Sequence, residues 1–427
     1  MAEAATRKSI EAVWRIESAR LIGALVRVVG DVGLGEDLAQ EALVAALERW
    51  PEAGIPENPG AWLMAAAKNR AIDLLRRNQM LERKHGALGD EASSAQPMVP
   101  NIEAALDEDV GDDLLRLVLI ACHPVLSTEA RVALTLRLLG GLATDEIARA
   151  FLVPEPTIAQ RIVRAKRTLA EARVPFEMPR GEELDARLPS VLEVIYLIFN
   201  EGYAATRGDE WMRTDLCEDA LRLGRILAEL VPEYAEVHGL VALMELQASR
   251  ARARVGPSGE PILLLDQDRS RWDQLLVHRG LAALARAETL SRPLGPYALQ
   301  AAIAACHARA ARAEQTDWKR IVALYDALVE LTHSPVVELN RAVAVAMAFG
   351  PAVGLELVDA LVDEPTLQSY HLLASVRGDL LAKLGRTDEA RKEFERAALM
   401  SQNARERELL LARAKALRAL SSRRSGG

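Results

Sequence analysis

From about residue 184 to residue 420 the chain is a succession of alanine- and leucine-rich segments, and this feature limits the fold more than any other. Hydrophobic residues make up 50% of the sequence, whereas aromatic residues make up only 4%. Alanine and leucine have high helix propensity, while strands are enriched in aromatic and β-branched residues. The sequence therefore predicts an all-α protein. Because 427 residues exceed the length that one hydrophobic core usually stabilises, we expect about two to four domains.

Several classes of protein are excluded by what the chain contains. Cys122, Cys217 and Cys306 lie far apart, which fits neither a disulfide framework nor a zinc site. His123 and His307 each follow a cysteine but have no further ligands near them in the sequence, so we expect no metal and no cofactor. The N-terminus has no apolar signal-peptide core, and no run approaches the roughly 18 apolar residues of a membrane helix, so we expect a soluble, cytoplasmic protein without a membrane segment.

An acidic segment separates two helical blocks. Residues 85–115 contain acidic side chains, two prolines and no lysine or arginine. This composition predicts a linker over residues 79–111, between a helical domain at 9–78 and a second one at 112–173. The stretch "RVPFEMPRGEE" marks the next boundary, so a helical extension is expected over 184–420.

The extension contains at least one helical-hairpin repeat. In "VRGDLLAKLGRTDEARKEFERAAL", small residues and one aromatic occupy the packing positions of a tetratricopeptide-type hairpin, at Gly378, Ala390, Phe394 and Ala397. Weaker echoes of this pattern occur at Ala220, Leu227 and Pro232, and at Ala323, Ala327 and Pro335. We therefore expect a degenerate tetratricopeptide-like array rather than a regular solenoid.

A helix-turn-helix is expected in the second block. In "ATDEIARAFLVPEPTIAQRIVRAKRTL", Thr144 is the expected N-cap of a helix that ends near Phe151, where "VPEP" interrupts it. The second helix carries one apolar stripe, at Ile158, Ile162, Ala165 and Leu169. Leu152 stands in the turn where glycine is frequent.

The second helix of this motif is basic on the side away from its stripe, although the whole chain has a net charge of −8. A short helix, a turn and a basic amphipathic helix is the arrangement of a major-groove reader. Glutamine and arginine pair with base edges, and lysine and arginine with phosphates. The candidate DNA-binding residues are Thr157, Gln160, Arg161, Arg164, Lys166 and Arg167. The alternative is a basic helix that is merely solvated.

The N-terminal block adds two further patterns. "GDVGLGEDLAQEALVAALERW" places acidic and amide side chains on one polar helix face, at Glu36, Asp37, Gln40 and Glu41. After a proline-bearing loop, "NPGAWLMAAAKNRAIDLLRR" predicts a predominantly basic helix.

Taken in order, these motifs resemble the sigma-70 family of RNA polymerase sigma factors, in the extracytoplasmic-function class. "GEDLAQEAL" is similar to region 2.2, "NPGAWLMAAAKNRAIDLLRR" to regions 2.3 and 2.4, and the helix-turn-helix to region 4. The resemblance implies that Glu36, Asp37, Gln40 and Glu41 bind the β′ coiled coil of core RNA polymerase. It also implies that region 4 meets the β flap and reads the −35 element of promoter DNA. The acidic linker would then thread the RNA channel of the polymerase.

The resemblance assigns −10 recognition to the basic helix and the loop before it. We expect Asn58, Gly60 and Trp62 to form a pocket for an unstacked base. Trp62 is either a core residue or a stacking partner. Contacts to the DNA strand are expected from Lys68, Asn69, Arg70 and Arg77.

The rest of the chain resembles the tetratricopeptide-like extension of one extracytoplasmic-function subgroup. "LPSVLEVIYLIFNEGYAAT", "LLDQDRSRWD" and "GPYALQAAIAACHARA" carry this likeness, which implies no conventional membrane anti-sigma partner. Two polar motifs of the extension are candidates for a regulatory interface, with Asn200, Glu201, Tyr203, Asp268, Arg269, Trp272 and Asp273. Local loop capping is the alternative. No set of catalytic groups accompanies them, so we expect no enzyme.

Two other functions compete with the sigma factor. A one-component regulator, with a helix-turn-helix joined to a sensory repeat domain, would leave the two N-terminal motifs without a purpose. A scaffold protein with an incidental basic helix would also leave the two N-terminal motifs unexplained. For a sigma factor we expect the extension to act in cis, and to assist assembly rather than inhibit it, since no releasing signal is visible in the sequence.

Overall fold

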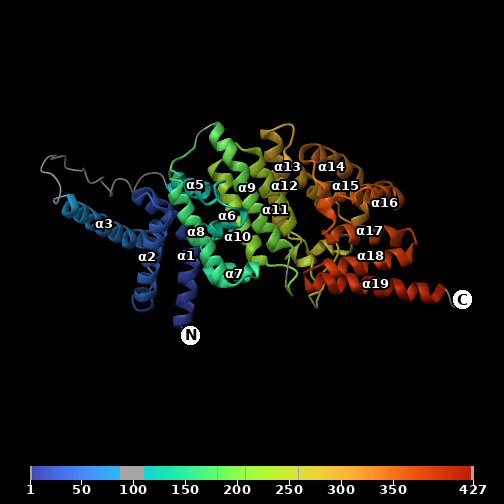
Figure 1. The fold of residues 1–427 in the computed structure, drawn as a ribbon, viewed down its shortest axis with the longest axis horizontal. Helices are drawn as coiled ribbons and strands as arrows, with labels where there is room; N and C mark the ends of the chain where they lie inside the picture. The colour runs from blue at the N-terminus through green and yellow to red at the C-terminus, as the bar shows by residue number, and fades with distance from the viewer. Residues whose placement is uncertain (1, 87–109, 180, 207, 258, 425–427) are drawn as a thin grey trace. The chain divides into compact units, whose positions relative to one another are not determined.

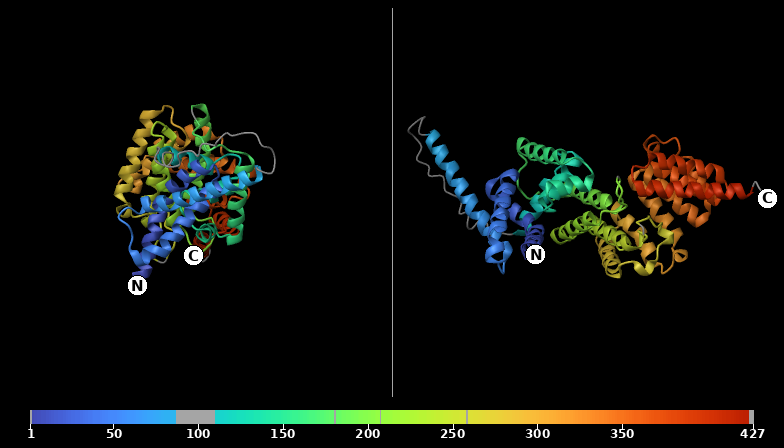
Figure 2. Two further views of the ribbon diagram at one scale, coloured as in Figure 1. Left: turned by 90° about the vertical axis from the view of Figure 1, so that its left-hand side faces the viewer. Right: turned by 90° about the horizontal axis from the view of Figure 1, so that it is seen from below.

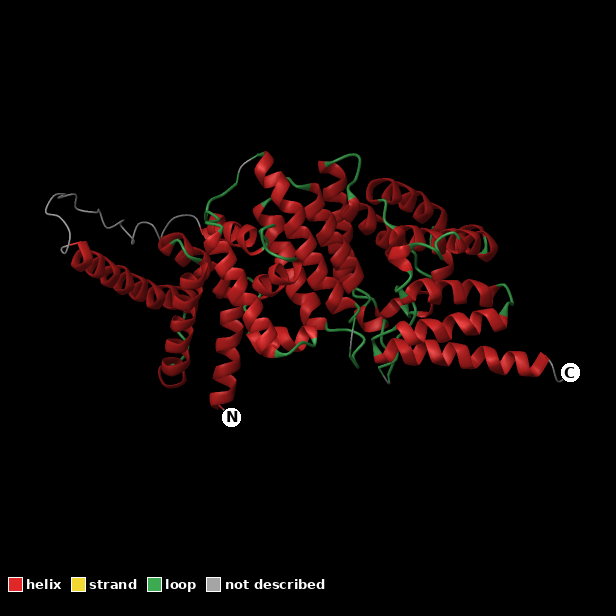
Figure 3. Cartoon of the chain, in the orientation of Figure 1, coloured by secondary structure: helices red, strands yellow, loops and turns green. Residues whose placement is uncertain are grey.

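The computed structural model describes residues 2–86, 110–179, 181–206, 208–257 and 259–424. Within these ranges every regular element is a helix, and only isolated β-bridges occur (Figures 1 and 3). The prediction of an all-α protein is confirmed. The chain forms two compact units, Met1–Ile195 (unit 1) and Tyr196–Gly427 (unit 2). Most of the predicted acidic linker, residues 87–109, lies outside the described residues.

The first part of unit 1 is a bundle of α1 (Ala2–Val29), α2 (Val32–Ala53) and α3 (Pro59–Gly86). The Asp31 side chain caps α2 by accepting a hydrogen bond from the Leu34 amide, at 2.7 Å. At Gly35 a Cβ atom would lie 2.5 Å from Cγ2 of Val26, so the close approach of α1 and α2 requires glycine there. Helix α3 extends past α2 (Figure 2) and includes residues 79–86 of the predicted linker.

The second part of unit 1 contains α5 (Val110–Ala121), α6 (Thr128–Leu138), α7 (Thr144–Phe151) and α8 (Glu155–Glu171). The N-cap of α7 is Ala143, so the expectation that Thr144 caps this helix is wrong. The Ala143 amide instead donates a hydrogen bond to the carboxylate of Glu146, at 2.8 Å. A glutamate three residues into a helix can satisfy the cap amide in this way without a capping hydroxyl.

Helix α9 (Glu182–Tyr203) crosses the boundary between the units. Its first half packs within unit 1, where the Ser190 hydroxyl donates to the carbonyl of Cys122 at 2.7 Å. Glu193 forms an ion pair with Arg131 of α6, at 3.1 Å. The predicted extension therefore begins with residues that belong to unit 1.

Unit 2 continues as a chain of helical hairpins in which neighbouring helices pack on each other, as Figure 1 shows for α17, α18 and α19. Its helices are α10 (Thr214–Leu230), α11 (Ala235–Ala248), α12 (Gln274–Leu290), α13 (Pro296–Arg309), α14 (Trp318–Thr332), α15 (Pro335–Phe349), α16 (Pro351–Asp359), α17 (His371–Lys383), α18 (Thr387–Met400) and α19 (Ala404–Arg424). The prediction of a helical array is confirmed.

The repeat signature explains the packing of α17 on α18. A Cβ atom at Gly378 would lie 3.1 Å from the Phe394 ring, and Ala390 and Ala397 are fully buried. Ala220 and Leu227 are likewise buried in α10. By contrast Ala323 is exposed, so its alignment with a packing position is wrong. A small residue in a helix does not by itself indicate which face is covered.

One buried side chain ties the last helix of unit 2 to its first loop. The Asn403 amide donates to the carbonyls of Ala205 and Glu210, at 3.0 and 2.9 Å. Its carbonyl oxygen accepts from the Arg405 amide at 3.0 Å and so caps α19. Asn403 is 1% exposed, and Gly208 pairs with it through an isolated β-bridge.

Unit 2 is expected to lose stability on mild acidification because of His307. Burial, with smaller effects of Arg250 and Arg269, lowers the pKa of His307 to about 4. In the unfolded chain its pKa is about 6.5, so between these values the unfolded state binds more protons. Neutral His307 therefore makes its whole contribution to the free energy of unfolding above about pH 6.5. This contribution falls by about 3 kcal/mol as the pH approaches 4.

Denaturant unfolding of the full chain between pH 7.5 and pH 5 measures this loss. His307→Gln should flatten the pH dependence, whereas His278→Gln, at an exposed histidine, should not. An unchanged pH dependence in His307→Gln would contradict the assignment.

Candidate nucleic-acid interface

The turn between α7 and α8 sets the position of the predicted recognition helix. Leu152 has a φ of 50°, in the left-handed region where glycine is the usual residue. The turn is closed by the Val153 amide, which donates to the Ala148 carbonyl at 3.1 Å. Pro156 lies in the first turn of α8, where its missing N–H costs no hydrogen bond.

The predicted apolar stripe of α8 is confirmed, since Ile158, Ile162, Ala165 and Leu169 are the buried residues of this helix. On the opposite side Gln160, Arg164 and Arg167 are exposed. Gln160 and Arg164 make no hydrogen bond or ion pair within the described part of the chain, whereas Arg167 pairs with Glu171 at 2.6 Å. An exposed, largely unengaged row of this kind is available to base edges and phosphates.

Thr157 and Arg161 are half-buried at the side of the same helix. Arg161 lies near Glu129 of α6, whose pKa is held below its ordinary value. Hydrogen bonds from its own backbone amide and from Ser127 are the main cause, with a smaller contribution from Arg161. The Glu129 carboxylate and the Arg161 guanidinium attract each other, so a negative charge lies near this member of the predicted DNA-binding set.

Lys166 does not lie with the exposed row. Its Nζ atom is 2.5 Å from Oε2 of Glu36, and its side chain is 20% exposed. Oε1 of the same carboxylate accepts a hydrogen bond from Nε of Arg137, at 2.6 Å. Oε2 of Glu36 has no hydrogen-bond partner, so its contact with Lys166 is an ion pair that lacks hydrogen-bond geometry.

The predicted polymerase face on α2 is divided by this contact. Asp37 and Glu41 are exposed, and Gln40 is half-buried and donates to Glu36. Glu36 itself is 2% exposed. The acidic surface available to a partner is therefore that of Asp37 and Glu41, of which Glu41 also pairs with Arg70 of α3 at 3.1 Å.

The residues predicted for −10 recognition lie at the start of α3 and along it. Asn58 caps the helix, its Oδ1 accepting from the Ala61 amide at 3.0 Å. Gly60 approaches α1 so closely that a Cβ atom would lie 2.8 Å from the Glu17 carboxyl group. Trp62 is half-buried and packs edge-on against buried Trp50, with ring centroids 5.3 Å apart.

The predicted strand contacts follow Trp62 along the same helix. Asn69 and Arg77 are exposed, while Lys68 and Arg70 are half-buried. The helix therefore presents basic and amide groups to solvent over several turns.

The two polar motifs of the extension come together in unit 2 around arginines. Arg254 lies over the Tyr203 ring at 3.5 Å from its centroid, and Arg250 lies 5.8 Å from the rings of both Tyr203 and Trp272. Arg269 donates to the carbonyls of His307 and Ala310. The motifs therefore organise the irregular segments between the helices.

The remaining motif residues also have local roles. Asp268 and Asp273 cap the 3-10 turn Arg269–Arg271 and α12, respectively. Glu201 accepts hydrogen bonds from Arg213 and Thr206. Trp272 is buried, and Asn200 is exposed. These contacts favour the loop-capping alternative for most of the set.

Sequence reasoning missed Arg137, Arg250 and Arg254. The density of arginine in "SRARARV" is a signal for the last two, because arginines so close together need acceptors or aromatic faces. Arg137 carries no such signal, since its partner Glu36 lies 101 residues away.

The described residues contain neither a metal-binding cluster nor an exposed thiol. No group of three or more histidine, cysteine or acidic side chains there could hold a metal ion. The three cysteines are buried, and burial raises the pKa of the Cys122 and Cys217 thiols to about 11 and about 12. In the same part of the chain, no helix has both the length and the apolar character needed to cross a bilayer.

Comparison with known families matches three segments of the chain. Residues 15–80 match sigma-70 region 2, and residues 116–169 match sigma-70 region 4. Residues 187–288 match a family of unknown function, DUF6596. The two sigma segments correspond to the two parts of unit 1, and the third begins within α9.

The chain is also similar to individual proteins. The chain is 44% identical to an uncharacterized protein of Rhizobium meliloti (strain 1021) over 387 residues, 90% of each chain. It is 30% identical over 168 residues to the probable ECF RNA polymerase sigma factor SigI of Mycobacterium tuberculosis, covering 39% of this chain and 56% of that protein. It is 28% identical over 169 residues to the ECF RNA polymerase sigma factor SigL of the same species, covering 39% of this chain and 90% of that protein. With region 2, region 4 and a long helical extension in order on one chain, the protein belongs to the sigma-70 family.

Proposed function

We propose that the protein is a sigma factor of the extracytoplasmic-function class, which binds core RNA polymerase and directs it to specific promoters. One observation carries the proposal. An exposed acidic face on α2 and an exposed face of arginine and glutamine side chains on α8 lie in the two segments that match sigma-70 regions 2 and 4. A regulator that only binds DNA needs the second face but not the first.

The partners follow from these two faces. Asp37, Gln40 and Glu41 are the proposed contacts of the β′ coiled coil, with Glu36 joining them when its internal partners are released. Gln160, Arg161, Arg164 and Arg167 are the proposed contacts of the −35 element, and region 4 would also meet the β flap. The start of α3 and its exposed polar side chains would hold the −10 strand, and the whole process would take place in the cytoplasm.

Run-off transcription with purified core enzyme on a library of genomic promoter fragments tests the proposal. The full chain should co-purify with core enzyme and start transcripts at a defined subset of fragments. A one-component regulator would bind its DNA sites without core enzyme and would start no transcripts. That outcome would exclude the sigma factor.

Arg164→Ala is expected to relax promoter preference at particular −35 positions. An arginine that pairs with two atoms of a base contributes about 1–3 kcal/mol of discrimination. Arg167→Ala is the comparison, because a phosphate contact weakens binding evenly over all sequences and reduces the salt dependence. Both profiles are read from a randomised −35 library, and an Arg164→Ala profile equal to that of the wild type would remove Arg164 from the base-reading set.

For the extension, the proposal is control of the sigma module in cis. Two contacts in unit 1 support it, since Ser190 and Glu193 of α9 bind Cys122 and Arg131 within region 4. A covalently attached partner of this kind offers a route of control that needs no membrane anti-sigma factor. Asn200 and the capped loop at Asp268 are the exposed candidates for its regulatory surface.

A further inference from the structure

Three arginines of unit 2, which we call the arginine cluster, gather around two aromatic rings: Arg250, Arg254 and Arg269. Cζ of Arg250 lies 5.8 Å from the ring centroids of both Tyr203 and Trp272. Cζ of Arg254 lies 3.5 Å from the Tyr203 centroid, and Cζ of Arg269 lies 5.1 Å from the Trp272 centroid. Each of the other two arginines therefore shares one ring with Arg250.

The hydrogen bonds that the structure describes for the arginine cluster go to neutral acceptors. Arg250 donates to the Tyr203 hydroxyl at 2.7 Å and to a side-chain amide oxygen. Arg254 donates to the Tyr203 carbonyl, and Arg269 donates to two other carbonyls and to the Thr316 hydroxyl. In the ranges that the structure describes, no carboxylate forms an ion pair with any of the three arginines. The cluster therefore carries three positive charges without an internal counter-charge.

Burial makes this excess of positive charge unfavourable. Arg254 is 7% exposed, and arginines buried so deeply are almost always paired with an acidic group. Burial lowers the pKa of Arg254 and of Arg269, and repulsion from Arg250 lowers both further. Exposed Glu314 offsets part of this effect at Arg269 but forms no ion pair with it among the described residues. Because guanidinium groups stay protonated, an anion from solution would stabilise the cluster.

Two hydrogen-bond donors at the arginine cluster also lack a partner. The Trp272 side chain is 5% exposed, and its indole N–H has no acceptor in the described structure. Nε of Arg269 is buried and has no acceptor there either. Buried donors are nearly always hydrogen-bonded in native proteins, so each indicates a position for an additional acceptor. Since Arg250, Arg269 and Tyr203 are only half-buried, solvent reaches the cluster.

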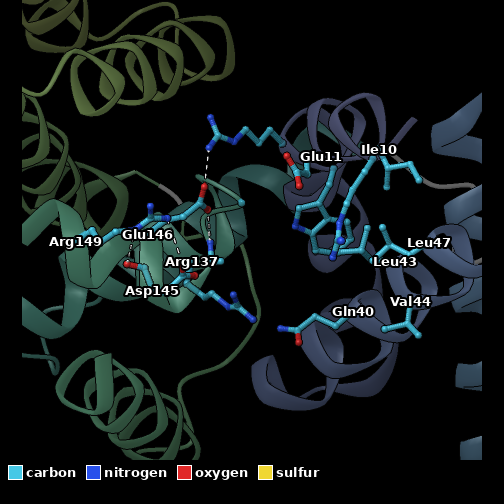
Figure 4. Close-up of a pocket in the computed structure, with 15 residues that line it drawn as sticks. Ile10, Glu11, Gln40, Leu43, Val44, Leu47, Arg137, Asp145, Glu146 and Arg149 are labelled. Carbon is cyan, nitrogen blue, oxygen red and sulfur yellow. Dashed lines mark hydrogen bonds and ion pairs between the residues drawn. The ribbon is translucent and has the colours of Figure 1, made fainter. Parts of the chain in front are cut away.

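A pocket in unit 1 provides a contrast (Figure 4). This pocket has a volume of about 580 Å³ and is lined by side chains of both charges. Arg149 pairs there with Asp145, and Arg15 pairs with Glu146, both at 3.1 Å. The chain itself neutralises these arginines, whereas it leaves those of the arginine cluster without a counter-charge.

We infer that the arginine cluster is a binding site for a small molecule that carries two or more negative charges on phosphate or carboxylate groups. A guanidinium group donates two parallel hydrogen bonds to such an oxyanion and can keep its face against an aromatic ring. Three positive charges favour a multivalent anion over a monovalent one. The site lies within the segment that matches DUF6596, and the inference does not depend on the sigma factor activity.

Thermal unfolding of the full chain with added pyrophosphate or citrate tests this site. Sodium chloride at matched ionic strength is the reference. At about a hundredfold excess over Kd, at least one of the two anions should raise the unfolding temperature by about 5 °C, because the ligand binds only the folded state. A response to pyrophosphate alone would identify phosphate chemistry, and a response to citrate alone would identify carboxylate chemistry.

Arg250→Gln is the main variant, because in the described structure Arg250 donates only to side chains. It should weaken binding of the effective anion by about tenfold or more. Arg252→Gln removes the same charge from an exposed arginine in the adjacent 3-10 turn and should leave the affinity unchanged. Arg250→Lys keeps the charge but loses the paired donors, so its affinity should be intermediate. Circular dichroism should show equal helical content in the wild type and all three variants.

Indole fluorescence gives a second readout that does not depend on stability. Binding beside Trp272 should change the emission of the full chain, and Trp272→Phe should lose most of this change while it keeps an aromatic ring. Multivalent anions also stabilise proteins by exclusion from their surface. An equal rise in unfolding temperature in the wild type, Arg250→Gln and Arg252→Gln would therefore be a general salt effect and would overturn the site.

Absence of any response of the wild type to both anions, in unfolding temperature and in fluorescence, would overturn the site as well. None of these measurements uses polymerase or DNA. Failure of the anion site is therefore distinguishable from failure of the run-off experiment.

Discussion

The double variant Asp37→Lys, Glu41→Lys is expected to lose binding to core RNA polymerase almost completely. Both side chains are exposed on α2, beside buried Glu36, and they form the acidic surface that remains available in the free protein. Losing one charge pair in an interface costs about 2–5 kcal/mol, and reversal adds repulsion. The two changes together should reduce affinity by about a thousandfold or more.

Co-purification with core enzyme and a binding titration measure this loss. The control is Glu330→Lys with Glu356→Lys, which makes the same change in net charge at exposed helical positions of unit 2. Helical content should be equal in the wild type and both variants, because Asp37 and Glu41 do not contribute to the core. If the α2 variant binds core enzyme as well as the control does, the assignment of this face to the polymerase is wrong.

Removal of residues 184–427 is expected to reduce promoter-directed transcription, although every predicted DNA contact of regions 2 and 4 remains. The deletion takes away Ser190 and Glu193, and with them the contacts that α9 makes to Cys122 and Arg131. Coupling between two sites typically corresponds to 1–3 kcal/mol, so we expect a decrease of roughly 5- to 150-fold. Run-off transcription at matched protein concentrations measures it.

A shorter deletion, of residues 196–427, separates the two halves of α9. It keeps Ser190 and Glu193 and removes unit 2 alone. If unit 2 assists assembly, both deletions should lower activity, and an increase in either one would indicate inhibition instead. Equal activity of the full chain and both deletions would show that the extension is an independent module. Charge reversal at Arg269 is unsuitable for this purpose, because Arg269 holds backbone carbonyls inside unit 2.

Local patterns in the sequence predicted those parts of the site that depend on one helix at a time. The stripe from Ile158 to Leu169 was recognisable because helical periodicity alone determines which face is buried. Thr144 was misassigned as a cap because Glu146 can satisfy the amide of Ala143, which has no capping side chain. Propensity for a position does not reveal which neighbour supplies the hydrogen bond.

Contacts between distant segments could not be predicted in the same way. Glu36 shares a helix face with Asp37 in the sequence pattern, but its burial depends on Arg137 and Lys166, which the chain brings to it only after folding. The polar motifs of the extension were identified correctly as unusual, while their arginine partners at 250 and 254 were not. The pattern of charges in a sequence indicates that a charged side chain needs a partner, but it does not indicate which residue that partner is.

Asn403 changes how unit 2 should respond to damage at its ends. In an open repeat array each hairpin contacts only its neighbours, so a terminal helix can detach and leave the remainder intact. Here the amide that caps α19 also holds the carbonyls of Ala205 and Glu210, at the opposite end of the unit's sequence. The Asn403 side chain therefore joins the first loop of unit 2 to the N-terminal end of α19, and this end of the helix cannot leave without breaking the hydrogen bonds to the loop. Asn403→Ala is consequently expected to loosen both the start of α19 and the segment that follows α9, although the two lie at opposite ends of the unit's sequence.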